Sequence, residues 1–123
     1  MENDIKNYIE DHIPELKGRL YPVFTTDLKN ISVVYFFIPL SGGHVKQSQV
    51  ELKVIHADYD TCKEYEERIE AVLDMEEDAP FVVSGATRFH SSISGGGCLF
   101  NDDCQMFEDT LYFIVNWRQK NER

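Results

Sequence analysis

The chain has 123 residues, of which 42% are hydrophobic and 12% aromatic. This composition is enough for one domain with a single core and argues against disorder. The formal net charge is −10, and because such a surface repels phosphate backbones we expect no sequence-specific nucleic-acid binding. No apolar run approaches the roughly 20 residues of a spanning helix, and the acidic start lacks the pattern of a signal peptide. We therefore expect synthesis in a reducing cytoplasm and no membrane partner.

The N-terminal segment is predicted to form an amphipathic helix that Asn3 or Asp4 can cap. Pro14 should kink this helix or restart it as a second short helix, because proline lacks an amide donor and clashes with the preceding turn. Gly18 and the following residues 21–22 should end it. The apolar positions recur three and four residues apart and are Ile5, Tyr8, Ile9, His12, Ile13 and Leu16.

A predicted hairpin follows. Residues 31–40 are apolar on both faces, which favours a central position in a sheet. Residues 45–56 alternate between apolar and polar side chains, as in a strand with one wet face. The turn between the two strands is Ser41-Gly42-Gly43, which can adopt positive φ.

The middle of the chain predicts a second helix, capped by Asp58 or Asp60 and continuing to about Leu73. Cys62 lies on its apolar stripe and is expected in the core. Residues 75–78, three of them acidic, should break this helix before Pro80. Residues 81–93 should then form one or two strands.

The C-terminal third contains the most strongly patterned strand of the chain. Residues 110–117 read Thr-Leu-Tyr-Phe-Ile-Val-Asn-Trp and are largely apolar on both faces, so this strand should pair inside the sheet with both faces covered or nearly so. The preceding Gly95-Gly96-Gly97 is expected to be the flexible tip of a long hairpin. These elements predict a single α+β domain over residues 1–123: an approximately four-stranded, mainly antiparallel sheet with two helices packed on one face.

Candidate chemical groups are few and scattered, so we expect no catalytic, cofactor-binding or metal-binding residues and no enzyme activity. The four histidines do not show the spacing of a metal-binding pair. Cys98 and Cys104, with His90 and either Asp102 or Asp103, could in principle surround zinc, but free thiols are favoured over that site. The glycine run lacks the lysine and the following helix of a phosphate-binding loop.

The chain resembles the tail-terminator and tail-completion proteins of long-tailed phages and prophages, some of which are called minor capsid proteins. The resemblance is one of layout and covers nearly the whole chain in order and length. It rests on five segments: Val33-Val34-Tyr35 leading to Gly42-Gly43, the strand Val50–Val54, the helix opened by Tyr59-Asp60-Thr61, the run Gly95–Gly97, and Phe107–Phe113.

This resemblance implies a structural virion protein, made in the bacterial host cytoplasm, that caps the tail tube and joins the tail to the head. Its implied partners are further copies of itself, in a ring that is hexameric in lambda-like phages, and tail-tube or head-connector proteins. Another neck or head-completion protein is an alternative, as is a small bacterial enzyme or ligand-binding domain. The loops that could reach a neighbour contain the expected subunit-interface residues Ser41, Gly42, Gly43, His44, Gly95, Gly96, Gly97, Asp102 and Asp103.

Overall fold

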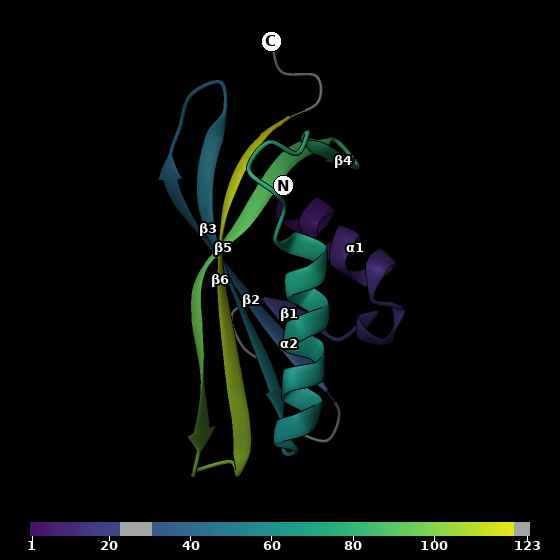
Figure 1. The fold of residues 1–123 in the computed structure, drawn as a ribbon, viewed down its shortest axis with the longest axis vertical. Helices are drawn as coiled ribbons and strands as arrows, with labels where there is room; N and C mark the ends of the chain where they lie inside the picture. The colour runs from purple at the N-terminus through teal and green to yellow at the C-terminus, as the bar shows by residue number, and fades with distance from the viewer. Residues whose placement is uncertain (23–30, 120–123) are drawn as a thin grey trace.

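A computed structural model of the chain describes residues 1–22 and 31–119. Six strands form one twisted sheet in the order β1-β2-β3-β6-β5-β4, and two helices lie on one side of it (Figure 1). The strands are β1 (Leu20–Pro22), β2 (Ser32–Ser41), β3 (Lys46–His56), β4 (Val82–Ser84), β5 (Thr87–Asn101) and β6 (Met106–Gln119). The helices are α1 (Glu2–His12) and α2 (Tyr59–Leu73), with a short 3₁₀ turn at Pro14–Leu16.

The expectation of an approximately four-stranded, mainly antiparallel sheet is wrong. The sheet has six strands and is mixed, because β1 runs parallel to β2 while the other neighbours are antiparallel. Residues 81–93, where one or two strands were predicted, contain β4 and the start of β5. The strand that was not predicted is β1, which has only three residues and is too short to show the period-2 pattern from which strands are predicted.

Helix α1 ends at His12, and the chain restarts at Pro14 as a 3₁₀ turn, as predicted from the proline. The predicted cap is wrong: the helix begins after Met1 and has no side-chain cap. Asp4 instead holds the β4–β5 hairpin, since its carboxylate accepts a hydrogen bond from Thr87 Oγ1 at 2.6 Å and its backbone oxygen accepts one from Ser84 Oγ at 2.7 Å.

Helix α2 begins after Asp58, one of the two predicted caps. Asp58 Oδ2 accepts hydrogen bonds from the backbone N–H of Thr61 at 3.0 Å and from Thr61 Oγ1 at 2.7 Å, which satisfies an amide that the first turn leaves without a helical partner. At the other end, the buried Ser91 Oγ donates to the backbone oxygen of Leu73 at 2.6 Å. This bond attaches the end of α2 to β5, and it shows how the residues after the helix reach the edge of the sheet.

One hydrophobic core lies between the helices and the inner face of the sheet. Cys62 belongs to this core, as predicted. Burial of such side chains is the main source of stability for a domain of this size. The fully buried side chains with the largest volumes come from both helices, from the segment 13–16 that follows α1, and from strands β2, β3, β5 and β6: Phe89, Phe113, Ile5, Ile9, Ile13, Leu16, Leu52, Ile69, Leu73, Leu111, Val33 and Val50.

Strand β6 lies inside the sheet between β3 and β5, which confirms the predicted internal pairing of residues 110–117. Leu111, Phe113 and Val115 are buried against the helices. Tyr112 and Ile114 on the outer face are half-buried, although both helices lie on the opposite side of the sheet. Neighbouring side chains on the same face therefore provide the cover, as when Tyr112 Oη donates to Glu51 Oε1 at 3.2 Å.

The predicted central position of β2 is wrong. It is the second strand from the edge and pairs with β1 only over residues 33–35. Its first half is buried, whereas Phe36, Ile38 and Leu40 are exposed on a hairpin arm. The apolar pattern on both faces therefore reflects exposed apolar surface as well as burial.

Candidate functional site

Two β-hairpins point in opposite directions: the hairpin of β2 and β3 extends beyond the helices, and the hairpin of β5 and β6 runs beside α2 (Figure 1). We call the hairpin of β2 and β3, residues 36–50, the upper arm, and the hairpin of β5 and β6, residues 94–109, the lower arm. The first group of expected interface residues, Ser41–His44, lies at the tip of the upper arm, and the second group, Gly95–Asp103, lies on the lower arm. The structure thus places the two groups at opposite ends of the sheet, so they cannot form one site within a single chain.

The upper arm is apolar and carries no acidic residue. Residues 41–45 at its tip are all exposed, and Gly43 has φ +109°. The charged and titratable side chains of the arm are Lys46 and His44. Lys46 Nζ lies over the Trp117 ring, 5.1 Å from its centroid. Its exposed apolar side chains, between 37% and 47% exposed, are Phe36, Ile38, Leu40 and Val45.

The lower arm differs from the expected flexible glycine tip. Gly95, Gly96 and Gly97 lie within β5 and pair with Tyr112, Leu111 and Thr110 of β6. The turn itself is residues 102–105, where the backbone N–H of Asp103 donates to Asn101 Oδ1 at 3.0 Å. A strand with consecutive glycines has no side-chain pattern to reveal it, which is why the sequence suggested a loop.

The three glycines have different surroundings. A Cβ on Gly96 would lie 2.4 Å from the backbone oxygen of Thr110, so this glycine permits the close approach of β5 to β6. A Cβ on Gly95 or Gly97 would meet nothing within 4 Å. These two positions therefore form a strip of bare backbone on the outer face, beside Leu99, which is 60% exposed.

A buried charged cluster lies beneath α2 and was not predicted from the sequence. Asp109 of β6 is fully buried, and its Oδ2 lies 3.6 Å from Lys63 Nζ. Lys63 Nζ is also 2.9 Å from Glu66 Oε2. Within the described part of the chain, neither carboxylate oxygen of Asp109 has a hydrogen-bond partner. The only sequence signal is that Asp109 occupies an inward position in the alternation that continues with Leu111 and Phe113.

The ionisation of this cluster follows from burial and proximity. Burial, and then the neighbouring Glu66 carboxylate, raise the pKa of Asp109 to about 7. Burial alone would raise the pKa of Glu66, but its interactions with Asp109 and Lys63 lower that pKa instead. The hydrogen bond to Glu66 raises the pKa of Lys63. The cluster attaches α2 to β6 at Asp109, the last residue of the lower arm.

Burial disfavours the thiolate form of two of the three cysteines. Cys62 is buried, Cys98 and Cys104 are half-buried, and all three are free thiols. Burial raises the pKa of Cys62 to about 12 and also raises that of Cys98, which disfavours the nucleophilic thiolate. In residues 1–22 and 31–119, no group of three or more His, Cys, Asp or Glu side chains could hold a metal ion.

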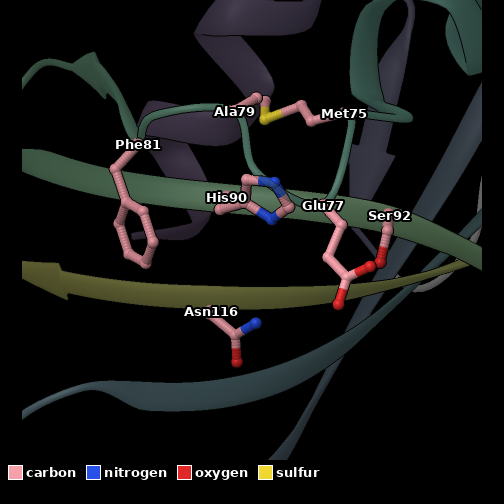
Figure 2. A pocket seen from close by; sticks show the side chains of 7 residues that line it. All are labelled: Met75, Glu77, Ala79, Phe81, His90, Ser92 and Asn116. Carbon is pink, nitrogen blue, oxygen red and sulfur yellow. The ribbon is translucent and has the colours of Figure 1, made fainter.

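A hollow of about 550 Å³ lies between the outer face of the sheet and the segment that connects α2 to β4 (Figure 2). His90 Nε2 donates to the backbone oxygen of Glu76 at 2.7 Å, which holds this segment against the sheet. No hydrogen bond joins His90, Ser92 and Glu77 into a catalytic arrangement. The hollow is lined by Met75, Glu77, Ala79, Phe81, His90, Ser92 and Asn116.

No described helix is long and apolar enough to cross a membrane. No family model matches the chain, and no curated protein matches it either. Among solved structures, a chain described as "Virion of native gene transfer agent (GTA) particle" has a similar fold, with a TM-score of 0.68 and 12% sequence identity. The match covers 95% of this chain and 93% of the other chain. At this identity the likeness establishes a shared fold across the whole domain.

Proposed function

We propose that this protein is a structural component of a phage-like virion and acts as a tail terminator, a ring subunit that caps the tail tube and joins the tail to the head. The observation that carries the proposal is the likeness of fold, over almost the full length of both chains, to a chain from a gene transfer agent virion. The order of elements that resembles the tail-terminator family supports the more specific role.

The shape of the chain suits assembly. A subunit of a ring must contact one neighbour on each side, and two arms that point in opposite directions provide two separate contact surfaces. Both arms expose apolar side chains, including Ile38 and Leu40 on the upper arm and Leu99 and Phe100 on the lower arm. Exposed apolar groups gathered on protruding hairpins are typical of protein–protein contact sites.

The charge suits a channel for DNA. A formal charge of −10 gives a ring of such subunits a strongly acidic surface. Phosphate backbones are repelled by that surface, so DNA can pass without binding. The residues expected at the interfaces are those of the two arms, Ser41, Gly42, Gly43, His44, Gly95, Gly96, Gly97, Asp102 and Asp103, and the proposed partners are further copies, tail-tube proteins and head-connector proteins.

Removal of the gene from the phage or prophage that carries it tests the proposal. Loss of a tail terminator should give tail tubes of irregular length and heads without tails, seen by negative-stain electron microscopy. Adding the purified chain to tubes from that mutant should restore a uniform length and a density at the tube end. Tails of normal length attached to no head would instead indicate a head-completion protein, and wild-type particles would exclude a virion role.

A further inference from the structure

In the described part of the chain, β2 and β5 each have a stretch of unpaired backbone edge, and these stretches lie along opposite lateral edges of the sheet. Strand β2 pairs with β1 only over residues 33–35, so its edge beyond Tyr35 has no partner among residues 1–22 and 31–119. Strand β5 pairs with β4 only over residues 87–89. The segment after α2 then bonds to β5 at Ser91 and Ile93, and beyond this no described residue pairs with that edge. Unpaired edges are templates for an added strand.

We propose, on the basis of the ring function above, that the upper arm of one copy adds to the lower arm of the next copy as an antiparallel strand, β2 against β5. The pairing follows from strand direction. Successive neighbours β2, β3, β6 and β5 are antiparallel, so β2 and β5 run in opposite directions in each chain. Two copies in the same orientation, displaced along the strands so that the upper arm of one lies beside the lower arm of the next, therefore bring these edges together as an antiparallel pair, a head-to-tail contact of the kind that forms a ring when its rotation closes.

The backbone groups on the β2 edge can be identified. The N–H of Val33 donates to Arg19 O at 2.9 Å, so the odd-numbered residues of β2 direct their backbone groups away from β3. Phe37 and Pro39 are the next such residues. Proline at an outward position costs the sheet no internal hydrogen bond, and the edge still offers the N–H and C=O of Phe37 and the C=O of Pro39.

The backbone groups on the β5 edge follow in the same way. Ser91 O accepts from the N–H of Met75 at 2.9 Å, which shows that Ser91 faces the edge. The irregularity between Ile93 and Gly95 shifts the alternation by one residue. Beyond it, Gly96, Cys98 and Phe100 direct their backbone groups outward.

In the register that we propose, Phe37 lies opposite Cys98 and Pro39 opposite Gly96 of the next copy. The outer faces then match, because Ile38 lies against Gly97 and Phe36 against Leu99. The bare glycine strip accommodates the bulky apolar side chains of β2, a complementarity that the single chain does not use, since nothing lies within 4 Å of a Cβ at Gly97. Apolar side chains packed across glycine in a neighbouring strand stabilise such pairs.

Charge supports the same arrangement. In this register the tip of the upper arm faces the segment after α2 of the next copy, where Glu76, Glu77 and Asp78 are all exposed. The upper arm carries Lys46 and His44 and no acidic residue between positions 36 and 50. This local attraction favours the head-to-tail contact in spite of the overall repulsion between chains of charge −10.

Disulfide trapping tests the pairing. In a Cys98→Ser, Cys104→Ser background, which keeps only the buried Cys62, the variant with Ile38→Cys and Gly97→Cys should form a ladder of covalent oligomers on non-reducing gels. Positions 38 and 97 form a pair that is not hydrogen-bonded, with Cα atoms about 4.5 Å apart, which a disulfide spans. Mixing the two single variants should stop at dimers, because the contact is head-to-tail.

The matched control pairs Ile38→Cys with Val83→Cys. Val83 is exposed on the same side of the sheet, but it pairs with Arg88, nine residues from position 97 along β5 and therefore roughly 30 Å away. A ladder from this control, or a dimer from Ile38→Cys alone, would contradict the proposed pairing.

Charge reversal tests the proposed electrostatic attraction between neighbouring copies. A Lys46→Glu variant should assemble at least tenfold less well, and adding Glu77→Lys should recover most of the loss. If assembly does not recover, the attraction between the upper arm and the segment after α2 is contradicted.

The failure of this inference can be distinguished from failure of the proposed function. Both are measured with the variant chains added to tail tubes that lack the terminator. Rings seen by electron microscopy without the bridge between positions 38 and 97 would overturn the strand pairing and leave the ring function intact. Tubes that bind no copies of the wild-type chain would overturn both.

Discussion

Lys63 of α2 places its Nζ 3.6 Å from Oδ2 of Asp109, an aspartate that is fully buried in β6. The same ammonium group lies 2.9 Å from Glu66, so one cation serves two carboxylates beneath the helix. Cys62 and Cys98 also face this cluster from α2 and β5. The arrangement makes the attachment of α2 to the lower arm sensitive to pH.

The first prediction is a fall in stability between about pH 4 and pH 7. The pKa of Asp109 is raised from 3.8 to about 7, so the folded state binds this proton more tightly than the unfolded state, and the contribution is lost as pH rises through that window. Asp109→Asn should reduce the pH dependence of urea unfolding by roughly 1–3 kcal/mol between pH 4.5 and 7.5. An unchanged slope would show that Asp109 is not protonated in the fold.

The second prediction separates the three glycines of the lower arm. Gly96→Ala should lower the free energy of unfolding by roughly 1–3 kcal/mol, because its Cβ would meet Thr110 O at 2.4 Å. Gly97→Ala has open space around it and should be neutral or stabilise by up to about 1 kcal/mol, since alanine is less costly than glycine in a strand. Thermal unfolding of both variants measures the contrast, and equal effects would be inconsistent with the close approach at Gly96.

The third prediction concerns the link between α2 and β5. Ser91→Ala leaves the buried backbone oxygen of Leu73 without the hydrogen bond that Ser91 Oγ now donates at 2.6 Å, and it should cost about 1–2 kcal/mol. Ser94→Ala is the matched control, because Ser94 Oγ donates to Tyr112 O at 3.2 Å at an exposed position. Chemical denaturation should show little change for this control; a similar loss in both would point to strand propensity as the cause.

The fourth prediction concerns assembly. Replacing Asp102 and Asp103 with lysine should leave the fold intact, because both residues are exposed in the turn of the lower arm, and it should prevent the chain from capping tail tubes. The control makes the same change of charge at Glu64 and Glu67, which are exposed on α2. Tube lengths measured by electron microscopy compare the two variants. Normal capping by the Asp102, Asp103 variant would exclude this turn from the interface.

The structure changes the expected effect of deleting Gly95–Gly97. If these glycines formed a flexible hairpin tip, as predicted from the sequence, their deletion would leave the core intact. These residues instead pair with β6, and removing three residues from a paired strand moves the remaining side chains to the opposite face. Such a deletion is expected to disrupt the lower arm itself, so point substitutions are the cleaner test of assembly.

Local patterns were sufficient for several elements. The three- and four-residue spacing predicted both helices, Asp58 was one of the two residues predicted to cap α2, and Pro14 predicted the break after α1. The alternation of β6 predicted a strand inside the sheet. Each of these features depends on residues close together in the chain, where periodicity, capping and the missing proline amide act directly.

The features that the sequence did not predict depend on contacts between segments that are far apart in the chain. The three-residue strand β1 forms because β2 is available as a partner, and no local pattern encodes it. The division of the predicted strand region 81–93 into β4 and β5 also depends on their pairing. The exposed apolar arm of β2 looked like core, because the sequence of an apolar strand does not reveal whether anything covers it. The strand conformation of Gly95–Gly97 and the burial of Asp109 could not be predicted from the sequence for a similar reason. The partner of each, Thr110 for Gly96 and Lys63 for Asp109, is brought into contact only by the folding of the sheet and helix together.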